Sequence, residues 1–137
     1  SRLYEFLYHL CRSYSHQIPS ASLTGSQRDL QRVTHVMNWV KVHYPEPLSL
    51  ETAADSLALS KEYFCRLFKK YTGQTFLEYL NDVRTMHLYE DLQNSDETIT
   101  VLMEKNGLSN YKIFMRTFKK LYGSTPQKMR SNRIRHV

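Results

Sequence analysis

Glycine, proline and cysteine are scarce in this sequence, and long apolar runs are missing. The 137 residues include four Gly, four Pro and two Cys. So few glycines leave no glycine-rich loop that could cradle a phosphate. No apolar run approaches the roughly 18 residues of a transmembrane helix, and no secretory signal peptide opens the sequence. We therefore expect a soluble, cytoplasmic protein without membrane contact.

The side-chain groupings of catalytic and metal centres are also missing. The two cysteines, Cys11 and Cys65, lie far apart, and the histidines are scattered at positions 9, 16, 35, 43, 87 and 136. Metal sites use shorter spacings, and distant cysteines in a chain without an export signal are expected to stay reduced. No nucleophile and base, and no pair of carboxylates in an apolar pocket, stands out. The sequence therefore predicts no enzyme, no metal site and no cofactor.

Basic residues are in excess and are concentrated in three stretches. The net charge is +6. Residues 61–70 carry +3, and residues 111–120 and 127–137 carry +4 each, so the rest of the chain is at −5. Such an uneven distribution is typical of a nucleic-acid-binding surface. An acidic protein surface would fit the same charges, and this second class of partner stays open.

One basic stretch occurs twice, fifty residues apart. Residues 66–73 read RLFKKYTG and residues 116–123 read RTFKKLYG. Each copy lies in a predicted amphipathic helix, because apolar side chains recur at helical spacing. The residues expected to point inward are Phe64, Leu67, Phe68 and Tyr71 in the first helix and Phe114, Phe118 and Leu121 in the second. Those expected to point outward are Lys61, Glu62, Cys65, Arg66 and Lys69, and then Tyr111, Lys112, Met115, Arg116 and Lys119.

A short helix precedes each of these two helices. Ser49 and Thr98 can cap the short helices, and Ser60 and Asn110 can cap the longer helices that follow. Gly73 can end the first longer helix. A short helix, a tight turn and a second helix with a polar outer side form a helix-turn-helix unit. The sequence predicts two such units, the second with a turn one residue longer.

The remaining segments complete a predicted all-α fold. Residues 28–44 form a long core helix that ends before Pro45 and Pro47. Residues 76 to about 94 form a connecting helix of about 28 Å, at 1.5 Å per residue, close to the ~34 Å between successive major-groove faces.

The domain limits follow from these segments. Residues 1–26 hold an extra N-terminal helix and a linker, and the helix either ends an upstream domain or packs back on this one. A tandem domain follows, with its first unit at 27–74, the connecting helix at 75–95 and the second unit at 96–130. Residues 131–137 are expected to be a flexible basic tail.

A larger pattern spans about residues 28–130 and includes both units. It consists of Ser49, Leu50, Ala54, Ser60, Arg66, Phe68, Lys69, Lys70, Gly73, Tyr79, Leu80, Arg84, Ile99, Gly107, Arg116, Phe118, Lys119, Lys120, Gly123 and Pro126. This pattern resembles the DNA-binding domain of AraC/XylS-type transcription regulators. The chain departs from the family pattern at Thr85, Leu88, Met103, Asn106 and Leu108.

The resemblance implies a function and its partners. Seven helices would form two helix-turn-helix units that enter adjacent major grooves of double-stranded DNA and read an asymmetric site. It also implies a bacterial, nucleoid-associated regulator with RNA polymerase as a protein partner. Contacts with a small-molecule effector or a second copy would be made through an upstream domain.

The candidate site residues lie on the two units. Carried over position by position, the resemblance implies base-facing places at Glu62, Cys65, Arg66, Lys112, Ile113 and Arg116. The outward residues Lys61, Tyr111 and Met115 are added to the positions expected to contact bases. The positions expected to contact phosphates are Ser49, Ser60, Lys69, Lys70, Thr98, Asn110, Lys119 and Lys120. Arg66 and Arg116 can each pair with two acceptors of guanine, a contact worth about 1 to 3 kcal/mol of discrimination. Ile113 and Met115 can offer apolar contact to a thymine methyl group.

Overall fold

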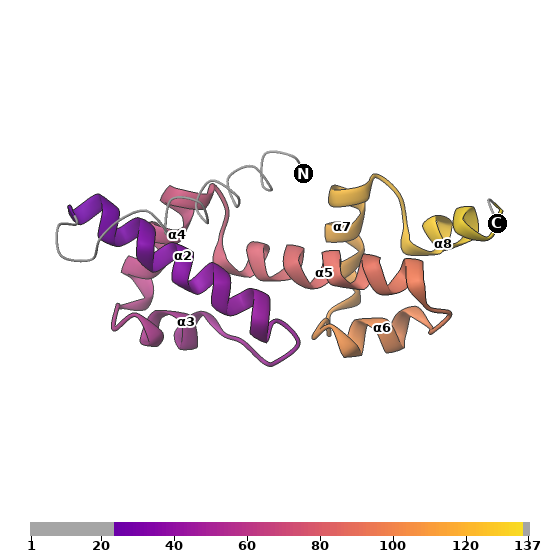
Figure 1. Ribbon diagram of the computed structural model, residues 1–137, viewed down its shortest axis with the longest axis horizontal. Coiled ribbons are helices and arrows are strands. Elements are labelled where there is room, and N and C mark those ends of the chain that lie inside the picture. The colour runs from indigo at the N-terminus through magenta and orange to yellow at the C-terminus, as the bar shows by residue number, and fades with distance from the viewer. Residues whose placement is uncertain (1–23, 136–137) are drawn as a thin grey trace. The chain divides into compact units, whose positions relative to one another are not determined.

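The computed structural model describes residues 24–135, and all regular structure in that range is helical (Figure 1). Its helices are α2 (Gly25–His43), α3 (Leu50–Ser56), α4 (Lys61–Thr72), α5 (Phe76–Asn94), α6 (Ile99–Lys105), α7 (Tyr111–Tyr122) and α8 (Pro126–Arg135). These seven helices confirm the predicted all-α fold, including the long helix from residue 76 to 94. The N-terminal helix predicted at residues 1–14 lies outside the described residues.

The described residues divide into two compact units. We call residues 24–42 and 48–77 the first unit, and residues 43–47 and 78–135 the second unit. The first unit contains the pair α3 and α4, and the second contains the pair α6 and α7. Each unit therefore holds one short helix followed by one longer helix, as the sequence predicts.

Helix α2 begins earlier than expected. Its first turn is closed by a reciprocal pair of hydrogen bonds, in which Thr24 N donates to Gln27 Oε1 at 2.8 Å and Gln27 N donates to Thr24 Oγ1 at 3.3 Å. This is a capping box, which satisfies two amides at the start of a helix. The predicted start at Arg28 is therefore wrong, and Gly25 and Ser26 belong to α2 rather than to the linker.

The first unit is built on apolar residues of α2, α3 and α4 and of the start of α5. The rings of Phe64, Phe68 and Phe76 contact one another with centroids 5.7 to 5.8 Å apart. The other fully or almost fully buried apolar residues are Val33, Val36, Met37, Val40, Ala53, Ala54 and Leu67. The repeated phenylalanines of the first copy are thus core residues, as predicted.

The second unit has an apolar cluster of its own. Its buried members are Leu88, Leu92, Leu102, Met103, Leu108, Phe114 and Phe118. Tyr89 stacks on Tyr122 with ring centroids 4.1 Å apart and covers one side of Phe118. Three of the five departures from the family pattern, at Leu88, Met103 and Leu108, are therefore ordinary core residues of this unit.

The other two departures place polar side chains in buried positions. Asn106 is 2% exposed, and its amide donates to Asp91 Oδ2 at 3.0 Å and to the Leu102 carbonyl at 2.8 Å. Thr85 is fully buried, and its hydroxyl oxygen has no hydrogen-bond partner among the described residues. The buried amide of Asn106 is therefore compensated by two hydrogen bonds.

Helix α8 replaces the flexible basic tail that we predicted. Residues 126–135 are helical, and Arg133 donates to the carbonyls of Leu92 at 2.7 Å and Ser95 at 3.1 Å. Arg133 also pairs with Asp96 at 2.8 Å. A cation at these carbonyls satisfies the end of α5 and interacts favourably with the helix dipole. The prediction of a flexible end is therefore wrong for residues 131–135.

The segment between α2 and α3 is fixed by hydrogen bonds within the second unit. Arg84 donates through Nε to the Tyr44 carbonyl at 2.6 Å and through a terminal nitrogen to the Glu46 carbonyl at 2.7 Å. Burial lowers the pKa of the Arg84 guanidinium. The Tyr44 ring stacks on His87 with centroids 3.9 Å apart. Arg84 therefore holds the backbone of this turn in place.

Candidate nucleic-acid interface

Helices α4 and α7 start and end in the same way. Ser60 Oγ accepts a hydrogen bond from Tyr63 N at 3.2 Å, and Asn110 Oδ1 accepts one from Ile113 N at 3.0 Å. Gly73 and Gly123 follow the helices with φ of 78° and 73°, a left-handed conformation that favours glycine. The predicted caps at Ser60 and Asn110 and the predicted helix end at Gly73 are confirmed.

The short helices α3 and α6 are capped as predicted too. Ser49 Oγ accepts from Thr52 N at 3.0 Å, and Thr98 Oγ1 accepts from Val101 N at 3.2 Å. In each of the four cap residues, Ser49, Ser60, Thr98 and Asn110, the side-chain oxygen therefore accepts a hydrogen bond from a backbone amide of its own helix. Phosphate contact by the four cap residues stays a prediction.

The turns between the paired helices share one hydrogen-bond pattern. Leu59 N donates to the Ala54 carbonyl at 3.0 Å, and Leu108 N donates to the Met103 carbonyl at 2.8 Å. Together with the neighbouring amide bonds, this is the Schellman motif, which requires a left-handed residue after the helix. Ala58 takes that place with φ 54°, and Gly107 takes it with φ 78°. The extra residue of the second turn therefore follows the shared motif.

The outer side of α4 is exposed and mostly basic. Lys61, Glu62, Cys65, Arg66, Lys69 and Lys70 are all exposed, so every predicted outward residue of this helix is confirmed as outward. Lys61 Nζ lies 3.2 Å from Glu51 Oε1. The pKa of the Glu51 carboxyl is lowered, first by a hydrogen bond from its own backbone amide and then by Lys61. Lys61 is thus partly neutralised, whereas Arg66 forms no ion pair with an acidic residue within residues 24–135.

A shallow hollow of about 430 Å³ lies beside the outer side of α4. Its lining consists of Cys65, Arg66, Lys69, Lys70, Thr75 and Phe76. Three cations, Arg66, Lys69 and Lys70, border it. The hollow is therefore part of the basic face of α4.

The outer side of α7 is exposed with one exception. Tyr111, Lys112, Ile113, Arg116, Lys119 and Lys120 are exposed. Met115 is half-buried and packs against the core of the second unit. The prediction that Met115 points outward is therefore wrong, because its long apolar side chain packs against the core of its unit. The corresponding residue of α4, Cys65, is shorter and is exposed.

Lys120 differs from the other outward lysines. Its Nζ lies 2.7 Å from Asp82 Oδ1, and the Asp82 side chain is 4% exposed. A nearly buried carboxylate needs a compensating charge. Lys120 supplies that charge, so it has a structural role in addition to the predicted phosphate contact, which stays untested. Asp82 was not predicted, although its place three residues after Tyr79 and directly before Val83 puts it on the apolar side of the helix pattern.

Two further contacts near the outer sides were missed. The Tyr63 hydroxyl donates to both carboxylate oxygens of Asp29 at 3.4 Å. Gln127 Nε2 donates to the Tyr111 hydroxyl at 3.5 Å. The fifty-residue repeat continues past Gly123, so that Thr125 and Gln127 correspond to Thr75 and Leu77.

Other kinds of site find no support within residues 24–135. No group of three or more His, Cys, Asp or Glu side chains in that range is arranged to hold a metal ion. None of the helices there is both long and apolar enough to span a membrane.

The chain matches a family model. The model is described as a helix-turn-helix domain and matches residues 53–132, which include α4, α5, α6 and α7 in full. Among curated proteins, the transcriptional activator RhaS of Escherichia fergusonii is 31% identical over 111 residues, which are 81% of this chain and 40% of that protein. The chain spans only 14% to 40% of the length of the curated relatives compared.

Solved structures agree with the family match. The DNA-binding domain of the transcriptional factor AdpA, solved in complex with a target DNA, is 25% identical, with a TM-score of 0.66 over 74% of this chain and 91% of that one. An AraC-type transcriptional regulator from Chromobacterium violaceum gives the same identity, TM-score and coverage. These relatives are transcription regulators and not enzymes. By its repeated motif, its fold and these similarities, the chain belongs to the AraC/XylS-type family of helix-turn-helix proteins.

Proposed function

We propose that this chain binds double-stranded DNA sequence-specifically through α4 and α7, as the DNA-binding part of a transcription regulator. The observation that carries the proposal is the equivalence of Arg66 and Arg116. Both are exposed, lie fifty residues apart and occupy the same position in helices with matching caps. An exposed arginine on such a helix can donate to two acceptors of one guanine in the major groove.

The relatives support the regulatory part of the proposal. AdpA was solved with its target DNA, and RhaS is named as an activator. The direction of regulation in this protein is a separate matter. Contacts with RNA polymerase, contacts with an effector or a second copy through an upstream domain, and a location in the bacterial cytoplasm at the nucleoid stay predictions.

The two outer sides differ in chemistry, which favours an asymmetric site. Glu62 in α4 corresponds to Lys112 in α7, and exposed Cys65 corresponds to half-buried Met115. Glu62 can accept from the amino group of cytosine, whereas Lys112 donates to guanine. One chain is therefore expected to read a directional sequence and not a palindrome.

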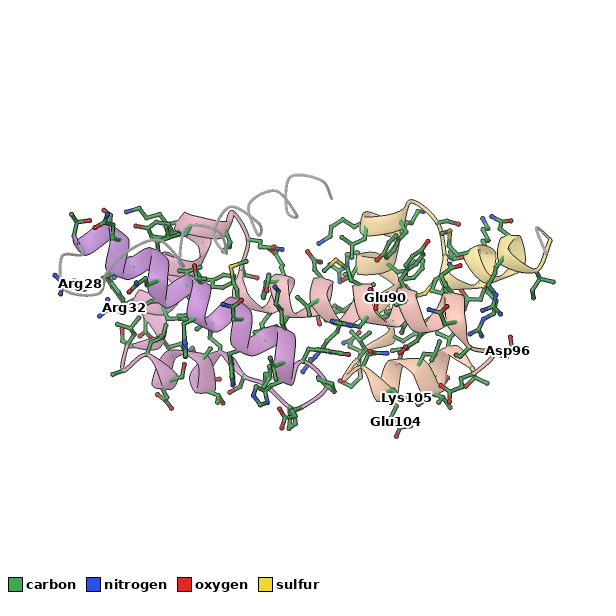
Figure 2. All side chains as sticks on the ribbon, viewed as in Figure 1. Arg28, Arg32, Glu90, Asp96, Glu104 and Lys105 are labelled. Atoms are coloured by element: carbon green, nitrogen blue, oxygen red, sulfur yellow. The ribbon has the colours of Figure 1, made fainter. Side chains whose placement is uncertain are left out.

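A binding site selected from a pool of random duplexes provides the main test. Arg66→Ala and Arg116→Ala should each weaken binding to the selected duplex by about 1 to 3 kcal/mol and weaken binding to a random duplex much less. Arg28, which is exposed on α2 (Figure 2), offers a control of the same charge. Arg28→Ala should change both affinities equally.

Two results would contradict the assignment. If Arg66→Ala left both affinities unchanged, α4 would not be a reading helix. If no duplex were enriched, the basic faces would be assigned to an acidic protein surface instead. The length of the protected DNA separates one reader from two, since two helical turns of protection require both α4 and α7.

The salt dependence of binding tests the phosphate contacts. The logarithm of the binding constant should fall linearly with the logarithm of salt concentration, with a slope of about −0.9 per phosphate contact. Lys69→Ala and Lys119→Ala should each make that slope about one unit shallower without altering base preference. An unchanged slope would remove that lysine from the set of phosphate contacts.

A further inference from the structure

Helices α4 and α7 differ in an exposed apolar side chain in the first turn. Ile113 of α7 is 36% exposed. It lies three residues before Arg116, so the two side chains are neighbours on the helix surface. Lys112, Arg116 and Lys119 make the surrounding surface basic. The alkyl group of Ile113 therefore lies within a basic surface that would attract DNA.

Helix α4 presents no equivalent alkyl group. The residue that corresponds to Ile113 is Tyr63, whose hydroxyl is held by Asp29 of α2. Met115, the other apolar candidate of α7, packs against the core. Tyr111 is exposed, but its ring lies against Phe114 with centroids 6.5 Å apart and its hydroxyl receives a bond from Gln127. Ile113 is therefore the best-placed aliphatic group on either outer side.

The major groove offers one apolar group to such a side chain. That group is the 5-methyl of thymine, and guanine presents the two acceptors that suit arginine. We propose, resting on the DNA-binding function above, that Ile113 contacts the methyl group of a thymine next to, or one base pair from, the guanine paired with Arg116. Sensitivity to the thymine methyl is then confined to the half-site of α7, meaning the base pairs read by that helix.

The test removes the methyl group and nothing else. Each thymine of the selected duplex is replaced singly by deoxyuridine, which keeps the pairing with adenine. The half-sites are assigned beforehand from the positions at which Arg66→Ala and Arg116→Ala relax base preference. At least one replacement in the α7 half-site should weaken binding about fourfold, the value for one buried methyl group. Replacements in the α4 half-site should leave affinity unchanged.

Two variants of Ile113 link the effect to this side chain. Ile113→Ala should bind the thymine and deoxyuridine duplexes equally well. Ile113→Val keeps a branched alkyl group and should keep most of the difference. Thermal unfolding of each variant shows that the fold is retained, since the side chain is partly exposed.

The outcomes separate this inference from the function it rests on. A duplex that is enriched and depends on Arg116, yet tolerates deoxyuridine throughout the α7 half-site, would overturn the inference and leave DNA binding in place. The same holds if Ile113→Ala keeps the full fourfold difference. The absence of any enriched duplex would overturn the proposed function itself.

Discussion

The two helix-turn-helix units share a backbone plan but place their special residues differently. The left-handed position of the turn is an alanine in the first unit and a glycine in the second. The cation that ends the repeated lysine pair is exposed as Lys70, whereas Lys120 pairs with a nearly buried acid. Corresponding residues of the repeat therefore have different structural roles in the two units, because their neighbours differ.

The neighbourhood of the second turn explains the glycine. A Cβ on Gly107 would lie 2.9 Å from the carbonyl oxygens of Tyr44 and Pro45. These carbonyls belong to the turn that Arg84 holds in place. Ala58 already carries a Cβ at the equivalent place. The left-handed conformation can be tolerated by alanine, but the close approach of backbone cannot.

The largest expected effect comes from a substitution in this turn, where the two units differ. Gly107→Ala should destabilise the protein by about 2 to 4 kcal/mol, from backbone strain combined with a steric clash. Gly123→Ala is the matched control, because its φ is 73° and no atom lies within 4 Å of its Cβ position. That control should cost about 1 to 2 kcal/mol. Urea unfolding of both variants measures the difference, and equal losses would show that the clash is relieved by a shift of the turn.

The second prediction concerns the helix that follows α4 and the helix that follows α7. The helix after α4 is the 19-residue α5, whereas the helix after α7 is the 10-residue α8. Arg133→Ala should destabilise the second unit by about 1.5 to 3 kcal/mol, because the side chain donates to two carbonyls and a carboxylate. Lys128→Ala, at an exposed position of α8, should change stability by less than about 0.5 kcal/mol. Indistinguishable melting temperatures would remove Arg133 from the structural set.

The third prediction compares the two lysines that end the repeats. Lys120→Met should cost about 1 to 2 kcal/mol, since it strips a partner from nearly buried Asp82 while Lys120 itself is half in solvent. Lys70→Met should cost less than about 0.5 kcal/mol. Chemical denaturation measures the loss of unfolding free energy in each of the two variants. A larger loss in Lys70→Met than in Lys120→Met would reverse it.

The smallest expected effect is a stabilisation of the first turn. Ala58→Gly relieves left-handed strain but increases the freedom of the unfolded chain, so the net gain should be about 0.5 kcal/mol. A calorimetric melting temperature one to a few degrees higher would be the sign of this gain. A lower melting temperature would show that the methyl group of Ala58 contributes packing that outweighs the strain.

The local chemistry of the chain made several features predictable. The cap residues, the helix 76–94 and the inward phenylalanines follow from short-range signals: a side-chain oxygen before a helix, a glycine after it and apolar spacing within it. Arg66 and Arg116 were predictable as outward residues for the same reason. The start of α2 was within reach too, since Thr24 and Gln27 form a capping box that the sequence displays.

Other features depend on residues that are distant in sequence. Met115 and Cys65 share one helical position, but only the packed core of the second unit decides that Met115 turns inward. Residues 131–137, which include Arg133, were expected to be flexible. The partners of Arg133, the carbonyls of Leu92 and Ser95, lie about forty residues earlier, so the local sequence does not indicate them. The role of Lys120 likewise depends on Asp82, which is 38 residues away.

By itself, the sequence determined the all-α fold, the two repeated units, their caps and their basic outer sides, because these depend on local propensity and periodicity. The tertiary structure decided which members of the repeat remain available at the surface. It paired Lys120 with an acid, packed Met115 against the core and held Arg133 at the end of α5, and it left Arg66, Arg116 and Ile113 exposed. The physical reason is that burial and pairing are set by neighbours brought together in space, which the spacing of residues along a helix does not record.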